Sequence, residues 1–162
     1  MEILFVRHAT AEVAGKGGDA ARKLTSKGVQ EAKMLAGALE AMDLAIDKVL
    51  TSPLARAAQT AAILGERMGA AVAESDLLGP GGDRDELRSL LRQLALEGLG
   101  AVALVGHTPT LEQMIGDLIA DNPAAGMSLS KAGAALVELS DNGSGAELRW
   151  LLRRSQLELM RE

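Results

Sequence analysis

The chain has 162 residues, of which 48% are hydrophobic and 24% charged, and its formal net charge at pH 7 is −5. These proportions indicate one compact domain over residues 1–162, and the absence of cysteine excludes disulfides, thiolate metal sites and cysteine nucleophiles, which favours a cytoplasmic protein. The scattered basic residues and the aromatic content of 1% exclude a nucleic-acid-binding role, and no uncharged run is long enough to span a membrane.

Apolar runs alternate with stretches of helical period, which is typical of an α/β protein. Strands are expected over residues 3–6, 48–51, 70–73, 101–105, 134–139 and 147–152, the last two forming a hairpin around Asp141-Asn142-Gly143. Helices are expected after Thr25, Ser52-Pro53, Asp83 and Thr108-Pro109, and loops over residues 9–24 and 77–82. The apolar stripe of the first helix is predicted to comprise Val29, Ala32, Leu35, Leu39 and Met42.

The two histidines of the chain each follow an apolar strand directly. Arg7 precedes His8, His107 follows the strand over residues 101–105, and Arg56 lies in the first turn of the helix opened by Ser52-Pro53. Because open α/β sheets bind ligands at the carboxyl ends of their strands, we expect these side chains and two helix N-termini to converge there. One guanidinium group can bind two phosphate oxygens at the same time, so we expect the pocket to bind phosphate. Arg7 would repel a metal ion and no carboxylate accompanies either histidine, so neither a metal nor another cofactor is expected.

These residues lie in four motifs that resemble those of the histidine phosphatase superfamily, and the resemblance covers most of the chain in the same order. The motifs are Leu4-Phe5-Val6-Arg7-His8-Ala9, Arg22-Lys23-Leu24-Thr25-Ser26-Lys27-Gly28, Thr51-Ser52-Pro53-Leu54-Ala55-Arg56-Ala57-Ala58-Gln59-Thr60 and Val105-Gly106-His107. The short length, with little room for an inserted cap domain, is similar to that of the SixA-type phosphohistidine phosphatases. The resemblance implies a three-layer α/β/α sandwich with a mostly parallel central sheet.

Two positions depart from the family pattern. Ala9 stands where the family usually has Gly, a change that we expect to be tolerated unless the backbone there needs a positive φ. Lys23 replaces the usual Pro, so the loop before Thr25 is expected to be less rigid.

The resemblance implies a mechanism in which His8 is the nucleophile and forms a phosphohistidine that water then hydrolyses. Arg7, Arg56 and His107 would hold the phosphoryl oxygens, and Arg22 is a further candidate for substrate binding.

No general acid can be matched to the family pattern. Asp76, Asp83 and Glu86 are the candidates, but Asp83 and Glu86 also have the spacing of a capping box. An imidazole leaving group departs readily, so the acid matters less if the substrate is a phosphohistidine.

The predicted function is therefore that of a metal-independent phosphatase, a hydrolase that removes phosphate from phosphohistidine on a protein in signal transduction, such as a histidine phosphotransfer domain. One alternative is a phosphomonoesterase acting on a small phosphorylated substrate on the same fold. Another is a non-catalytic module that binds phosphate or a phosphoprotein. Mutase activity is disfavoured because it calls for a more enclosed pocket.

Overall fold

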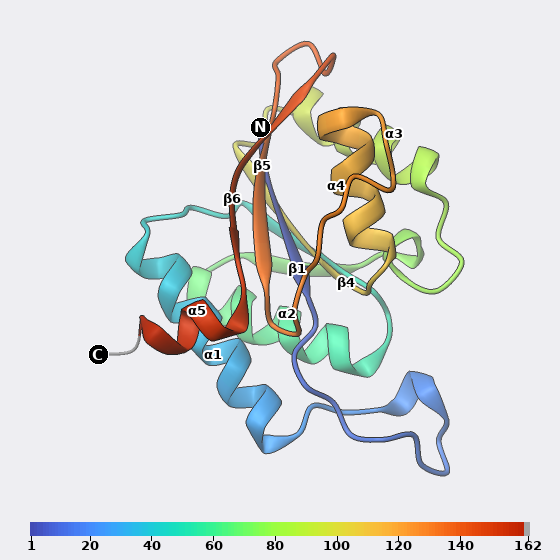
Figure 1. Cartoon of the computed structure of the whole chain (residues 1–162), viewed down its shortest axis with the longest axis vertical. Coiled ribbons are helices and arrows are strands. Elements are labelled where there is room, and N and C mark those ends of the chain that lie inside the picture. The colour runs from blue at the N-terminus through green and yellow to red at the C-terminus, as the bar shows by residue number, and fades with distance from the viewer. Residues whose placement is uncertain (161–162) are drawn as a thin grey trace.

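The computed structural model describes residues 1–160, so the last two residues of the expected domain lie outside the described part. A six-stranded sheet in the order β3-β2-β4-β1-β5-β6 forms its centre (Figure 1). Its strands are β1 (Glu2–Arg7), β2 (Lys48–Thr51), β3 (Ala71–Glu74), β4 (Ala101–Gly106), β5 (Ala134–Leu139) and β6 (Ala146–Leu152). The strands from β3 to β1 are parallel, and β5 and β6 add an antiparallel hairpin. The mostly parallel sheet and the terminal hairpin are thus confirmed.

Helices cover both faces of the sheet. They are α1 (Ser26–Ala41), α2 (Ala55–Met68), α3 (Arg84–Leu96), α4 (Thr110–Ala120) and α5 (Arg154–Leu159), with short 3-10 turns η1 (Asp19–Ala21) and η2 (Asp76–Leu78). One core packs α1, α2 and α5 against the sheet, and a second packs α3 and α4 against the opposite face. The predicted three-layer sandwich is therefore confirmed. Within residues 1–160, no helix has both the length and the apolar character needed to cross a bilayer.

The central strands β1 and β4 are buried on both faces, which explains their uninterrupted apolar sequences. Ile3 and Phe5 point into one core, and Leu4 and Val6 point into the other. Each large side chain buried in this way contributes about 1.5–3 kcal/mol of transfer free energy. Because β1 and β4 pair in parallel between two layers of helices, the positions of their carboxyl ends are fixed. Arg7, His8 and His107 lie at these ends.

Several element boundaries differ from the sequence prediction. Helix α2 begins at Ala55 and not at Pro53, because Ser52 Oγ accepts the Leu54 N–H at 3.2 Å and holds the turn that precedes the helix. Helix α4 likewise begins at Thr110, with Pro109 at its N-cap. Met42 is the C-cap residue of α1 and is 38% exposed, so it lies outside the buried stripe to which we assigned it.

Candidate active site

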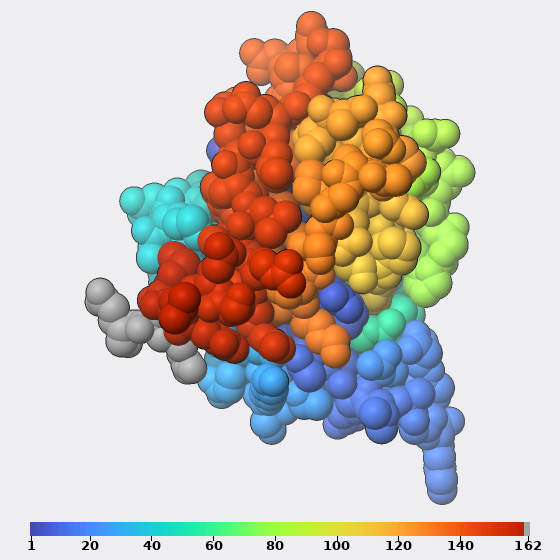
Figure 2. Space-filling model, viewed as in Figure 1, coloured from blue at the N-terminus to red at the C-terminus, as the bar shows by residue number. Residues whose placement is uncertain are grey.

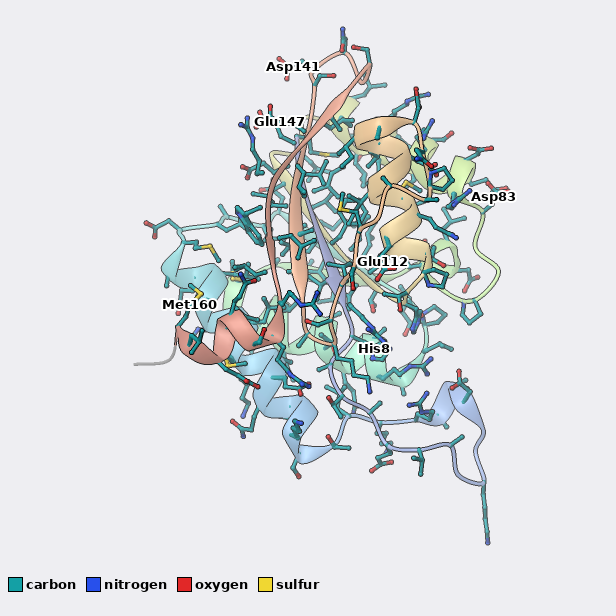
Figure 3. The ribbon with its side chains drawn as sticks, viewed as in Figure 1. His8, Asp83, Glu112, Asp141, Glu147 and Met160 are labelled. Carbon is teal, nitrogen blue, oxygen red and sulfur yellow. The ribbon has the colours of Figure 1, made fainter. Side chains whose placement is uncertain are left out.

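The carboxyl ends of three parallel strands bring the predicted residues together. Arg7 pairs in register with Gly106, so His8 and His107 follow their strands at the same level of the sheet. Strand β2 ends beside them, and Arg56 lies in the first turn of α2. Figure 3 shows His8 at this end of the sheet, far from the β5–β6 turn that carries Asp141. We call His8, Arg7, Arg56 and His107 the four-residue cluster.

The imidazole of His8 is held from both of its nitrogen atoms. Nδ1 lies 2.8 Å from the carbonyl oxygen of Ala9, which can only accept, so this nitrogen carries the proton. Nε2 accepts from Nε of Arg56 at 3.3 Å. The ring is therefore neutral with an unprotonated Nε2, whose electron pair accepts from Arg56, and an unprotonated nitrogen is the form that a nucleophile requires.

Arg7 and His107 complete the cluster. The ring centroids of His8 and His107 lie 5.1 Å apart, and Nη1 of Arg7 donates to the carbonyl of Leu129 at 3.0 Å. Nε2 of His107 lies 2.7 Å from Oγ of Ser52. Two buried nitrogens, Nε of Arg7 and Nδ1 of His107, have no hydrogen-bond partner within residues 1–160. Unsatisfied buried polar atoms in a folded protein are uncommon and call for a functional explanation.

Burial is the first cause of the low basicity of both histidines. It lowers the pKa of His8 to about 4 against the opposing bond to Ala9, with smaller contributions from His107, Arg56 and Arg7. Burial, followed by the charge of Arg56, lowers the pKa of His107 to about 4 as well. Both rings are consequently neutral at pH 7, and desolvation contributes more to this than the neighbouring cations do.

A carboxylate that the sequence analysis did not select contacts the cluster. Turn η1 places Asp19 so that its carboxylate accepts from Nη2 of Arg56 at 3.2 Å and its carbonyl accepts from Nη1 at 3.0 Å. The other carboxylate oxygen of Asp19 accepts from Arg22, whose Nε also bonds to the carbonyl of Glu12. In Figure 2 the loop over residues 12–22, in blue, projects from the lower edge of the molecule. Arg22 thus meets the cluster through Asp19, and its contact with a substrate stays a prediction.

The family to which this arrangement belongs follows from a comparison with known sequences. Residues 3–79, which contain His8, Arg7 and Arg56, match the model of the histidine phosphatase superfamily, branch 1. The chain belongs to the histidine phosphatase superfamily.

The most informative relatives of this histidine phosphatase place it in the SixA type. Phosphohistidine phosphatase SixA of Escherichia coli (strain K12) is 27% identical over 146 residues, 89% of this chain and 90% of the relative. An uncharacterized protein of Picosynechococcus sp. (strain ATCC 27264 / PCC 7002 / PR-6) is 33% identical over 135 residues, 82% of each chain. The structure of the protein histidine phosphatase SixA complexed with tungstate has a TM-score of 0.85 and 26% identity, covering 97% of this chain and 99% of that one. The chain is accordingly a phosphatase, a member of the hydrolase class.

Among residues 1–160, the three carboxylates proposed as general acids make no hydrogen bond to the cluster of this histidine phosphatase. Asp83 caps α3 by accepting from the backbone N–H groups of Asp85 and Glu86, at 2.8 and 3.0 Å, and Figure 3 shows it well away from His8. The capping interpretation of Asp83 is thus confirmed. Asp76 lies exposed in η2, and Glu86 is exposed on α3. Among the hydrogen bonds of residues 1–160, none joins these three side chains to His8, Arg56 or His107.

Alanine at position 9 fits the backbone without strain, because its φ is not positive. The residue that does adopt the left-handed conformation beside the site is Ala132, with a φ of 55°. Its N–H lies 3.2 Å from the carbonyl of Arg7 and 3.3 Å from that of His8, so the unusual backbone holds the end of β1.

Side chains from two helices hold the segment that follows His8. Oγ1 of Thr60 accepts from the Ala9 N–H at 3.1 Å and donates to the carbonyl of Arg56 at 2.8 Å. Glu31 of α1 accepts from both the N–H and the hydroxyl of Thr10. Glu31 is not among the residues expected from the sequence. A carboxylate next to Ala32 on an apolar helical stripe is the local signal of its burial, but its bond to Thr10 depends on how α1 packs.

The side chains around the four-residue cluster are poor ligands for a metal ion. Within residues 1–160, no three His, Cys, Asp or Glu side chains are placed to hold one together. The cluster instead presents guanidinium groups, which suit an anion.

Proposed function

We propose that this SixA-type chain removes phosphate from phosphohistidine on a protein, without a metal, through a phosphorylated His8. The observation that carries the proposal is the unprotonated Nε2 of His8, which accepts a hydrogen bond from the guanidinium of Arg56. Further support comes from the unpartnered nitrogens of Arg7 and His107, which can donate to phosphoryl oxygens. The relative in Escherichia coli is named a phosphohistidine phosphatase, and SixA binds tungstate, a tetrahedral oxyanion similar to phosphate.

In the first step, Nε2 of His8 attacks the phosphorus atom. The new N–P bond forms as the P–N bond of the substrate breaks, and the electron pair of that bond goes to the leaving imidazole nitrogen. Arg56 must release Nε2 and turn its donors to the phosphoryl oxygens, which Arg7 and His107 also contact. These groups stabilise the charge that the equatorial oxygens carry in the transition state.

In the second step, water attacks the phosphorus atom of phosphorylated His8. The N–P bond breaks, its electron pair returns to Nε2, and a proton from the water passes to solvent as inorganic phosphate leaves. The low pKa of His8, about 4, keeps the regenerated nitrogen unprotonated for the next cycle.

The proposed preference for phosphohistidine over an alkyl phosphate is supported by the ionisation of Asp19. The Arg22 guanidinium, and then Arg56, hold the pKa of Asp19 below its usual value, so the carboxylate that contacts the cluster is ionised. An ionised carboxylate cannot protonate an alkoxide leaving group. A protonated phosphoimidazole, by contrast, releases a neutral imidazole without a proton donor.

The test measures phosphate release in the presence of a chelator from a phosphohistidine protein and from para-nitrophenyl phosphate. The wild type is compared with His8→Ala and with Glu40→Gln, a control substitution at an exposed ion pair with Arg67 on α1 and α2. We expect release that resists the chelator, favours phosphohistidine, is lost in His8→Ala and is unchanged in Glu40→Gln. Faster release from para-nitrophenyl phosphate would favour a small-molecule phosphomonoesterase, and no release from either would favour a binding module.

A further inference from the structure

One peptide group lies between the nucleophile and a buried carboxylate. The carbonyl of Ala9 lies 2.8 Å from Nδ1 of His8, and the N–H of the same peptide group, that of Thr10, donates to Oε2 of Glu31 at 2.9 Å. A trans peptide is planar, and its C=O and N–H point in opposite directions. The three groups therefore form one line of hydrogen bonds, from His8 through the Ala9–Thr10 peptide to Glu31.

Glu31 is built into this position. It is only 4% exposed, its Oε1 accepts from the Thr10 hydroxyl at 3.0 Å, and the same oxygen lies 2.9 Å from Nη1 of Arg154. Arg154 is the first residue of α5, which packs against α1 (Figure 1). A buried carboxylate is costly unless it is paired and hydrogen-bonded, and both conditions are met here. The mechanism proposed above makes no use of it.

We propose that Glu31 is a positioning residue for the nucleophile and acts on His8 through the Ala9–Thr10 peptide. The inference rests on His8 being phosphorylated, as proposed above. By accepting from the Thr10 N–H, the carboxylate orients the peptide plane and polarises it, because linked hydrogen bonds strengthen one another. The Ala9 carbonyl becomes a stronger acceptor, which keeps the proton of His8 on Nδ1 and the electron pair on Nε2.

The effect of Glu31 grows during the reaction. When Nε2 of His8 bonds to phosphorus, both ring nitrogens are substituted and the ring acquires positive charge. The Nδ1–H then becomes a better donor, so its bond to Ala9 strengthens in the transition state, and an interaction that strengthens there raises the rate. Arg7, Arg56 and His107 face the ring with cationic or neutral groups. Asp19 pairs with Arg56 on the Nε2 side of the ring, and on the Nδ1 side the negative charge that acts through the backbone is that of Glu31.

A role confined to anchoring α5 would look different. The ion pair with Arg154 ties α5 to α1, and its loss would lower stability without changing the ring of His8. Arg154→Met therefore separates the two roles, because it removes the ion pair and leaves the bond from Thr10 N–H to Glu31 in place.

The experiment compares wild type, Glu31→Gln, Arg154→Met and the exposed control Glu40→Gln. It measures the melting temperature, the single-turnover rate of His8 phosphorylation and the tautomer of His8 from its ¹⁵N chemical shifts at pH 7. We expect Glu31→Gln to slow phosphorylation by about 10- to 100-fold, by analogy with outer partners that orient metal-binding histidines. It should also increase the fraction of the tautomer protonated on Nε2. Arg154→Met should lower the melting temperature while slowing phosphorylation less than Glu31→Gln does.

A rate and a tautomer in Glu31→Gln that equal those of the wild type would overturn the inference. So would equal losses of rate in Glu31→Gln and Arg154→Met without a change of tautomer. If Glu31→Gln does not fold, Glu31→Asp replaces it; this variant keeps the charge but shortens the reach, and an unchanged tautomer there would count against the inference. The tautomer is measured without substrate, so it distinguishes a failure of this inference from a failure of the proposed function.

Discussion

The carboxylate of Asp19 occupies donors of Arg56, the residue proposed to bind the phosphoryl group. This carboxylate accepts from Nη2 of Arg56, and Nε of the same guanidinium contacts His8. A phosphoryl group that binds Arg56 must share or displace this carboxylate. The exposed turn η1 can move more readily than the buried Arg56, so the substrate competes with a residue of the protein itself.

Asp19→Asn should therefore bind phosphate more tightly. Removing the competing charge should lower the inhibition constant of inorganic phosphate by about two- to fivefold, which corresponds to the usual free energy of an exposed ion pair. Competitive inhibition by phosphate at pH 7 measures the effect, with the exposed Glu66→Gln on α2 as the control. Weaker binding in Asp19→Asn would show instead that Asp19 orients Arg56 for the substrate.

The residues that sequence could identify are those whose position relative to a strand end carries information. His8 and His107 each follow an apolar strand, and parallel pairing then brings them to one level. Asp19 and Glu31 carry no such mark, because their contacts depend on how an irregular loop folds back and on how α1 packs. His8 and His107 can therefore be recognised from local sequence, whereas the contacts of Asp19 and Glu31 become visible only in the tertiary structure.

At the scale of the element, the N-terminus of α1 packs against the loop that follows His8. Thr25 caps the helix by accepting the Gly28 N–H at 3.0 Å, as predicted, and its own N–H donates to the carbonyl of Thr10 at 3.0 Å. A Cβ atom at Gly28 would lie 2.0 Å from that carbonyl oxygen. The helix can approach the loop only because this position has no side chain.

Gly28→Ala should accordingly destabilise the protein, although alanine is the better helix former. Because the clashing atom is backbone, the cost should lie in the upper part of the usual overpacking range, about 2–3 kcal/mol, which exceeds the roughly 1 kcal/mol gained from helix propensity. Gly37→Ala on the same helix is the matched control, since its Cβ would meet no atom within 4 Å and should stabilise the fold. Urea unfolding of both variants measures the difference, and a Gly28→Ala variant as stable as the wild type would refute the packing argument.

The sequence predicted the long elements and missed the short one. The four helices with apolar stripes were all identified, with starts displaced by up to two residues where Ser52 or Pro109 holds a turn before the helix. Helix α5 spans only Arg154–Leu159 and buries a single residue, Leu157, so it has no stripe to recognise. Its stability comes from packing on α1 and from the bond to Glu31, which no local pattern encodes.

For the molecule as a whole, the free energy of unfolding depends on pH because the folded protein keeps the imidazoles of His8 and His107 neutral. The pKa of both His8 and His107 is lowered from 6.5 to about 4 in the folded state. Between these values the unfolded chain binds more protons than the folded one. Their contribution to stability is therefore complete above about pH 6.5 and is lost as the pH falls toward 4.

We expect the free energy of unfolding to decrease with acidification in this window. The slope should approach about 1.4 kcal/mol per pH unit for His8 and be smaller for the more exposed His107. Urea unfolding at pH 7, 6, 5 and 4 measures it, and His107→Asn should show a shallower dependence than the wild type. A free energy that stays constant from pH 7 to 4 would contradict the lowered pKa values.

The position of β1 in the middle of the sheet has a consequence for the chain during its synthesis. Its two neighbours are β4, where Glu2 pairs with Ala101, and β5, where Glu2 pairs with Glu138. At about 5–20 residues per second, a ribosome needs several seconds to supply these partners after β1 has been made. Throughout that interval Ile3-Leu4-Phe5-Val6 is an unpaired apolar segment of the kind that chaperones bind, and His8 beside it lacks the neighbours that surround it in the folded protein. The end of β1 that carries Arg7 and His8 is therefore held in place only after both β4 and β5 have been synthesised.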